Sequence, residues 1–204
     1  MPATPSIEAA ETRERILDAA VDVLAQRGYS AAGVQEIVEL SGTSKGSFYF
    51  HFHSKEKMVM VLVDRMSEKL VKKVQDSVRH QPTPVHRVAA GIEVLMATFA
   101  RQRKIAQVLL LNIMGHGKVI DKKFLPVRDR FSGLIQQELD AAVAQGQIAP
   151  QDTALLSRMW VGSLQEVIMG WLLNGQPSRL TDATPALRAA LLRSIGVDPA
   201  SIQT

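Results

Sequence analysis

The chain has 204 residues, 46% of them apolar and 22% charged, proportions that are ordinary for a soluble globular protein of one large or two modest domains. It contains no cysteine, which excludes disulfides and thiolate metal sites, and we expect neither a secretory signal nor a membrane-spanning segment. The formal net charge is +4, but residues 1–80 hold 11 basic and 11 acidic side chains, so the overall charge gives only weak support for nucleic-acid binding.

Two helices are predicted in the N-terminal part of the chain. Apolar side chains recur at helical spacing from Ile16 to Leu24, which predicts an amphipathic helix that ends at Gly28. A shorter helix with one apolar stripe is predicted from Val34 to Leu40.

A tight turn and a third, aromatic-rich helix are predicted within Ser41–Lys55. Gly42 lets the backbone turn sharply, and Ser44 is a natural N-cap for the helix that follows. Phe48 and Phe52 lie four residues apart and share one face suited to burial. The order of these features predicts a helix-turn-helix motif whose second helix enters the major groove of DNA. A solvated helical hairpin with an aromatic core is the alternative.

The polar side chains of this third helix suit a DNA-facing surface. Ser44, Lys45 and Ser47 lie near its first turn, the end that a recognition helix presents to the bases. We expect Tyr49 and Lys55 to face outward and contact phosphate oxygens, which fix the register of a protein on DNA without reading sequence. The stretch contains two lysines and no acidic residue, so its local charge favours DNA more than the overall charge does.

Hydrophobic periodicity predicts that the rest of the chain is helical too. Two prolines, at positions 82 and 84, end the first of these helices, and Gly115-His116-Gly117 closes the second. The expected helices span residues 55–79, 85–114 with a break near 102–104, 126–144, 152–174 and 185–195.

The segment from residue 11 to about residue 60 resembles the TetR/AcrR family of bacterial transcriptional regulators. The matching residues are Gly28-Tyr29, the helix from Val34 to Leu40, Ser41-Gly42-Thr43-Ser44-Lys45-Gly46-Ser47, Phe48-Tyr49 and Phe52-His53-Ser54-Lys55-Glu56. The resemblance implies an all-α fold of about nine helices, with a three-helix DNA-binding helix-turn-helix domain over residues 1–53. Residues 54–204 would form a helical domain for effector binding and dimerisation. The DNA contacts expected on this basis are Gly33, Thr43, Ser44, Lys45, Gly46, Ser47, Tyr49, His51 and Lys55.

Two features depart from the family pattern. Gly33 stands where the family usually has a threonine or serine that caps the second helix and touches a phosphate, and glycine offers no hydroxyl for that contact. Ser41 and Thr43 replace the common alanine and valine, which loosens the hydrophobic seat of the hairpin slightly. Neither departure removes the DNA-facing chemistry.

The helix predicted over residues 152–174 is apolar nearly all round, so it needs cover on two sides. The resemblance implies that it forms half of a four-helix bundle together with the last helix and a second subunit. The two DNA-binding domains of one dimer would then lie about 34 Å apart, the length of one turn of DNA. The alternative is a monomer in which this helix is fully internal. The residues expected at the dimer interface are Gly162, Ser163, Val167, Gly170, Trp171, Leu187 and Leu191.

The resemblance also implies that the C-terminal domain binds a small molecule that lowers affinity for operator DNA. Residues 101–130 carry a net charge of +6, which indicates either a solvated face or a site for an anionic effector. We therefore expect a lipophilic effector. An anionic effector of this kind would carry a phosphate or carboxylate group at one end, as an acyl coenzyme A does. The residues expected to contact it are Met96, Phe99, Met114, Phe131, Ile135, Met159 and Trp160.

The sequence gives little support to other functions. The five histidines lie within the DNA motif or at helix ends without the spacing of a catalytic or metal site, so no enzyme activity, metal or cofactor is expected. A helical adaptor that has lost DNA binding is the main alternative. The expected partners are double-stranded operator DNA, a second copy of the chain and the effector, with no membrane, in the cytoplasm. Repression is the family default.

Overall fold

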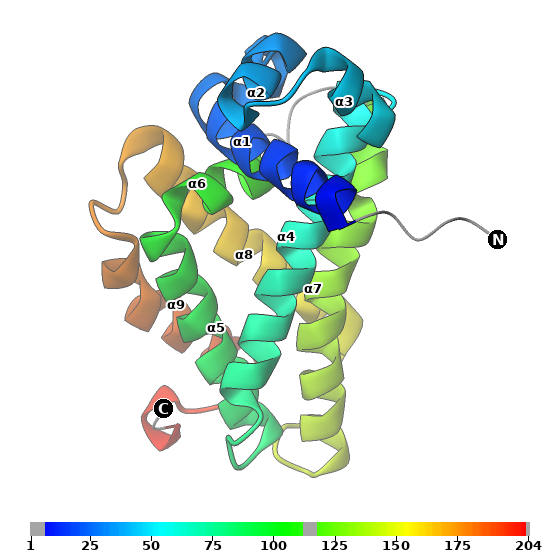
Figure 1. Cartoon of the computed structure of the whole chain (residues 1–204). Coiled ribbons are helices and arrows are strands. Elements are labelled where there is room, and N and C mark those ends of the chain that lie inside the picture. Colours follow the sequence, from blue (N-terminus) through cyan, green and yellow to red (C-terminus); the bar gives the residue numbers. More distant parts are fainter. Residues whose placement is uncertain (1–6, 112–117, 203–204) are drawn as a thin grey trace, which may run out of the picture.

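The computed structural model describes residues 7–111 and 118–202, with side chains described for residues 7–110 and 126–202. Over these residues the chain is built from helices without strands (Figure 1). The helices are α1 (Ile7–Ala31), α2 (Val34–Ser41), α3 (Lys45–His51), α4 (Lys55–Val78), α5 (Pro84–Arg101), α6 (Arg103–Ala106), the π-helix η1 (Gln107–Leu111), α7 (Lys118–Ala144), α8 (Thr153–Asn174), α9 (Leu180–Ser194) and the 3₁₀ turn η2 (Pro199–Ser201). The expected all-α fold of about nine helices is confirmed.

Helices α1, α2 and α3 form a small head at one end of the molecule (Figure 1). α1 is interrupted at Gly28, whose φ of 72° is accessible to glycine at little cost, so the predicted end of the first helix is confirmed as a break. Side chains from the three helices meet in the core of the head, where Leu17, Ile37 and Phe48 are each fully buried.

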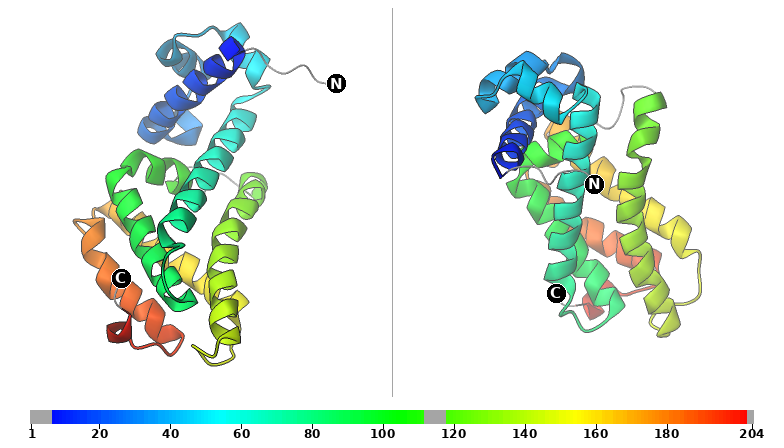
Figure 2. Two further views of the ribbon diagram at one scale, coloured as in Figure 1. Left: turned by 60° about the horizontal axis from the view of Figure 1, so that its bottom comes forward. Right: turned by 45° about the vertical axis from the view of Figure 1, so that its right-hand side comes forward.

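The long helix α4 leads from the head into the rest of the molecule (Figure 2). It begins as predicted after Ser54, whose side chain accepts a hydrogen bond from the amide of Lys57 at 3.1 Å. Its apolar face is buried from Met58 to Leu70. The chain reverses after α4, and α5 starts at Pro84 behind the N-cap Thr83, because proline suits the first turn of a helix.

Helices α5 and α7 pack against α4, while α8 packs against α7 and α9 packs against α5 and α8 (Figures 1 and 2). Two of them begin earlier than the sequence predicts: α7 starts at Lys118 and contains Pro126, and α9 starts at Leu180 and contains Pro185. A proline removes one backbone hydrogen bond from a helix, but burial of Leu180 in the core favours the extra turn of α9. The Gly115-His116-Gly117 segment lies outside the described residues.

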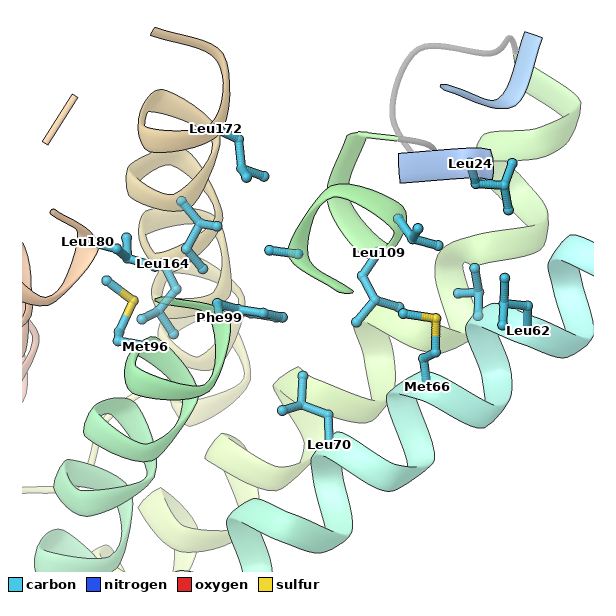
Figure 3. Close-up of a cluster of buried hydrophobic side chains, with 14 of the residues drawn as sticks. Leu24, Leu62, Met66, Leu70, Met96, Phe99, Leu109, Leu164, Leu172 and Leu180 are labelled. Atoms are coloured by element: carbon cyan, nitrogen blue, oxygen red, sulfur yellow. The ribbon is translucent and has the colours of Figure 1, made fainter. Parts of the chain in front are cut away.

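One hydrophobic core runs through the described part of the chain, from α1 to α9. Figure 3 shows where its layers meet: Leu109 of η1 lies between Leu24 of α1 and Met66 of α4, while Met96 of α5 faces Leu164 of α8. The head is therefore not joined to the rest of the molecule by α4 alone. The π-helix η1 packs beneath it.

Candidate nucleic-acid interface and cavity

The turn between α2 and α3 has the geometry of a helix-turn-helix motif. Gly42 adopts the left-handed conformation (φ 62°, ψ 33°), and the next amide, that of Thr43, donates to the carbonyl of Val38 at 3.0 Å. Ser41 is buried, and its hydroxyl oxygen lies 3.2 Å from the Val38 carbonyl and 2.8 Å from the hydroxyl oxygen of Thr43. Ser41 and Thr43, which replace the alanine and valine common in the family, are thus hydrogen-bonded to each other within the turn.

Helix α3 buries one side and exposes the other. Ser44 is its N-cap, as predicted, and accepts a hydrogen bond from the amide of Ser47 at 3.0 Å. Phe48 and Phe52 are both buried, with ring centres 5.7 Å apart. Because these two rings fix α3 against α1, the opposite face of the helix is held outward at the tip of the head.

The exposed face of α3 carries several of the predicted DNA contacts. Lys45 and Gly46 are exposed, and Tyr49 is 50% exposed with its ring edge-to-face against Phe48 at 5.3 Å. Gly33 is the N-cap of α2 without a side-chain hydrogen bond, so any contact there must use the backbone amides, as expected. A role in DNA binding for each of these residues stays a prediction.

The structure corrects the outward placement of Lys55. Its ammonium group donates hydrogen bonds to the carbonyl oxygens of Tyr29 at 2.7 Å and Ala32 at 2.8 Å, and lies 4.6 Å from the centre of the Tyr29 ring. Desolvation by partial burial lowers the pKa of Lys55 from its ordinary value of 10.5. Lys55 therefore ties the start of α4 to the end of α1 instead of pointing toward a phosphate.

His51, at the end of α3, is half-buried between two aromatic rings. Its ring centre lies 5.0 Å from that of Phe50 and 6.3 Å from that of Phe52. Desolvation, with a smaller contribution from the positive charge of Arg13, lowers the pKa of His51 from its ordinary value of 6.5. Burial therefore favours the uncharged imidazole, which can donate or accept a hydrogen bond.

A cavity of about 230 Å³ lies between α4, α5, η1, α7 and α8. Most of the side chains that line it are apolar, and every one of the five elements contributes some of them. Among those lining residues are Val74, Phe99, Leu109, Phe131, Ile135 and Ile168. Three residues that the sequence placed near an effector, Phe99, Phe131 and Ile135, are therefore in the cavity wall.

The other predicted effector contacts lie elsewhere. Met159 is 52% exposed on the outer side of α8, so its prediction as a cavity residue is wrong. Trp160 and Met96 are fully buried but outside the cavity wall, and the indole nitrogen of Trp160 donates to the hydroxyl of Ser194 at 3.0 Å. Met114 lies outside the described residues. Because α8 is apolar on every side, its sequence did not show which side faces the cavity.

Polar side chains mark the opening of the cavity. Gln75 of α4 and Arg128 of α7 both line the cavity and are exposed, so it opens to solvent between these two helices. Arg87 and Glu138, also in the wall, form an ion pair at 2.9 Å. Among the side chains that the structure describes, Arg128 is the lining cation without a carboxylate partner, so it can bind an anion at the opening.

The remaining described cations of the basic run mostly join helices to one another. Lys104 of α6 lies 2.6 Å from Asp22 of α1, and Arg130 of α7 lies 2.8 Å from Asp64 of α4. The guanidinium group of Arg103 lies 4.4 Å from the centre of an indole ring of α8 and donates to a backbone carbonyl of that helix at 3.0 Å. The run is therefore not one anionic-ligand surface. The side chains of residues 118–125 lie outside the described set.

The predicted interface residues of α8 and α9 divide into two groups. Gly162 is exposed, and Ser163, Val167 and Leu187 are half-buried, so these four remain available to a second subunit. For the other three, packing within a single subunit accounts for the residue type. Trp171 and Leu191 are buried in the core, and a Cβ at Gly170 would lie only 2.9 Å from a backbone carbonyl of the same chain.

Exposed leucines and a methionine on α8 were not among the predicted interface residues. Leu155, Met159 and Leu173 are 54%, 52% and 62% exposed. At about 100° per residue these three and Gly162 fall within a stripe about 60° wide along the helix. The helical spacing of these positions in the sequence could have shown that they share one face of α8.

Comparisons with known proteins point the same way as this geometry. Residues 16–61 match the family model described as bacterial regulatory proteins, tetR family. A fatty acid metabolism regulator protein of Bacillus subtilis is 22% identical over 182 residues, covering 89% of this chain and 94% of the relative. The transcriptional regulator SrpR of Pseudomonas putida is 26% identical over 172 residues, covering 84% and 78%. The crystal structure of the transcriptional regulator FadR from Bacillus subtilis in complex with stearoyl-CoA has a TM-score of 0.83 at 22% identity, covering 89% of this chain and 98% of that one.

The fold and the head together define a helix-turn-helix DNA-binding protein whose larger helical part contains an apolar cavity of about 230 Å³. Over residues 16–61 the chain matches the tetR family of bacterial regulatory proteins, as the resemblance predicted. Its relatives are regulators and not enzymes, which agrees with the expectation of no catalytic activity. None of the described helices has the length and apolar character needed to cross a membrane.

Proposed function

We propose that the chain is a repressor whose binding to operator DNA is lowered by an acyl-CoA effector. The observation that carries the proposal is the pairing of an outward-facing α3 with an apolar cavity whose wall includes η1, the element that packs against α1 of the head. In this proposal residues 1–53 are the DNA-binding domain and residues 54–204 bind the effector and dimerise. The protein acts in the cytoplasm, where its DNA is, without a cofactor.

α3 enters the major groove with its capped N-terminus first. Lys45 and Tyr49 contact phosphate oxygens from one side of its exposed face, while Ser47 and the backbone at Gly46 approach the base edges. Thr43, Ser44, Gly33 and His51 complete the predicted contacts along the backbone of one strand. Lys55 is left out of the contact set, because its ammonium group is engaged within the head.

A homodimer forms through the outer face of α8 together with α9. The stripe of Leu155, Met159, Gly162 and Leu173 runs the length of α8, and the exposed carboxylate of Glu166 is a charged interruption within it. A stripe of this kind costs free energy in water and is removed from it when two copies of α8 pack against each other. Gly162 lets the helices come close at the middle of the stripe. Two α3 helices are then presented to successive turns of the same face of DNA.

The effector places its acyl chain in the cavity and its anionic head at the opening, where Arg128 is free to pair with a phosphate. The likeness to a FadR that was crystallised with stearoyl-CoA supports this ligand class. The cavity volume of about 230 Å³ falls below the range of about 300–1,000 Å³ that drug-sized ligands occupy. A long acyl chain must therefore push the surrounding helices apart, which gives binding a mechanical consequence.

That displacement reaches the head through η1 and α6. Leu109 and Leu110 of η1 line the cavity, and the same element packs against α1. The Lys104–Asp22 pair fixes α6 to α1 at 2.6 Å. A shift of η1 therefore moves α1 relative to its twin in the dimer. A coupling free energy of about 1–3 kcal/mol, the usual size in allostery, is enough to release the operator in part or in full.

The test is a binding titration on the DNA upstream of the chain's own gene, with fluorescence anisotropy at moderate salt. Stearoyl-CoA should reduce the affinity, and neither free coenzyme A nor an uncharged lipid should do so. Arg128→Gln should weaken the response to stearoyl-CoA, whereas Arg101→Gln, which removes an exposed cation outside the cavity, should not. A protein that binds no DNA specifically would be a helical adaptor instead. An equal loss of DNA affinity with stearoyl-CoA and with an uncharged lipid would remove the acyl-CoA effector from the proposal.

A further inference from the structure

The exposed side of α3 carries an aromatic residue that is largely open to solvent. Phe50 is 77% exposed, although Phe48 and Phe52 on the same helix are both buried. A phenyl ring has neither a hydrogen-bond donor nor an acceptor, so it gains nothing from water at the tip of the head. Its position is fixed all the same, because its ring packs edge-on against that of His51 at 5.0 Å.

Helical geometry places Phe50 at the outermost line of α3. At about 100° per residue, Gly46 and Phe50 lie about 40° apart around the helix axis, and each lies about 160° from the buried Phe48. Lys45 and Tyr49 flank this line on one side and Ser47 on the other. The line through Gly46 and Phe50 is therefore the part of α3 that goes deepest into a groove.

Gly46 is not required by packing within the head. A Cβ built there meets only the hydroxyl oxygen of Ser44, at the ordinary contact distance of 3.6 Å. The bare backbone at Gly46 instead leaves room for the helix to approach something outside the fold. Phe50, one turn further along the same line, is then carried to the floor of the major groove.

The floor of the major groove offers one kind of apolar group, the C5-methyl group of thymine. We infer that Phe50 reads thymine in the operator through contact with this methyl group. The inference rests on the proposed DNA-binding function and assigns part of its sequence specificity. The alternative of a contact with the second subunit is disfavoured by position, since α3 lies at the opposite end of the molecule from α9 (Figure 1).

Deoxyuridine substitution tests this contact, because it removes the methyl group of a thymine and keeps the base pair. After footprinting has located the operator, each thymine of a half-site is replaced in turn and affinity is measured by fluorescence anisotropy. Loss of one buried methyl contact should weaken wild-type binding by about fourfold, and roughly 16-fold when both half-sites are changed. Phe50→Ala should bind the parent operator correspondingly more weakly and should not distinguish thymine from uracil at that position.

Two further variants separate this contact from a general loss of binding. Phe50→Leu keeps an apolar side chain and should retain part of the preference for thymine. Leu40→Ala removes another exposed apolar side chain of the head, on α2, and should keep the full wild-type preference. Circular dichroism and thermal unfolding should match the wild type for all three variants, since both side chains are exposed.

Two results would overturn the inference while leaving the proposed function intact. In one, the wild type binds every uracil-substituted operator as tightly as the parent DNA. In the other, Phe50→Ala loses affinity on uracil substitution exactly as the wild type does, so another residue touches the methyl group. If the wild type forms no specific complex with any fragment, the DNA-binding function itself is wrong and the inference is lost with it.

Discussion

Lys55→Met should destabilise the head without changing how strongly its DNA affinity depends on salt. Methionine keeps most of the length of the side chain but removes the two hydrogen bonds to the carbonyls of Tyr29 and Ala32 and the contact with the Tyr29 ring. A hydrogen bond from a charged donor contributes about 1.5–3 kcal/mol and an exposed cation–π contact about 0.5–1 kcal/mol. Lys55 is only half-buried, so water replaces part of this loss, and we expect about 2–3 kcal/mol in total.

Urea unfolding followed by circular dichroism measures the free energy of unfolding, and thermal unfolding should show a midpoint lower by about 4–12 °C for a chain of this size. Lys57→Met is the matched control, because it removes the same charge from the same turn of α4 where the side chain is exposed. Its stability should stay within about 0.5 kcal/mol of the wild type.

The salt dependence of DNA binding decides between the two roles of Lys55. A phosphate contact contributes about 0.9 per subunit to the slope of the logarithm of affinity against the logarithm of salt concentration. Lys45→Ala should lose a slope of that size, and Lys55→Met should keep the wild-type slope. A Lys55→Met protein of unchanged stability with the shallower slope would refute the structural role and restore the phosphate contact.

Two other predictions follow from single contacts. Because burial, and secondarily Arg13, lower the pKa of His51 below 6.5, the unfolded chain binds more protons than the folded chain between the two pKa values. The stability that His51 contributes is therefore complete above pH 6.5 and is lost as the pH falls through the lowered pKa; His51→Gln should flatten this part of a urea-unfolding series from about pH 5 to 8. Gly170→Ala should cost about 1–3 kcal/mol, since its Cβ would lie 2.9 Å from the carbonyl of Gln176. Gly133→Ala, on an exposed turn of α7 with open space around it, should instead raise the thermal midpoint slightly, and a Gly170→Ala protein as stable as the wild type would contradict the close approach.

Local signals in the sequence were enough to predict the helix starts and the turn of the head. Ser44 and Ser54 cap the helices that they were predicted to cap, because an N-cap hydrogen bond reaches only to an amide three residues along the chain. Gly42 and the burial of Phe48 were equally readable, since a turn and a four-residue spacing are both local.

Distant partners were not readable in the same way. The acceptors of Lys55 are backbone carbonyls 26 and 23 residues away, and every residue carries such a carbonyl, so no residue type marked them. Met159 was misplaced for a related reason. α8 is apolar around its whole circumference, and only the packed structure shows that Leu164 faces inward while Met159 faces out. Phe50 was given no role from the sequence, although its angle from Phe48 on the helix was already set by their spacing.

The continuity of the core argues that the cavity and the head cannot change independently. Leu109 lines the cavity and also belongs to the buried cluster that contains Leu24 of α1 and Met66 of α4 (Figure 3). Close-packed interiors transmit displacement, because side chains that are already in contact cannot absorb the added volume of a ligand. η1 is a π-helix, a form that is rare and marginal in stability, so it is the wall element that most easily changes its geometry. The exposed Lys104–Asp22 pair adds a second link between the same elements, from α6 to α1. In the proposed mechanism, ligand volume entering beside Leu109 would thus displace α1, the helix that supports α3.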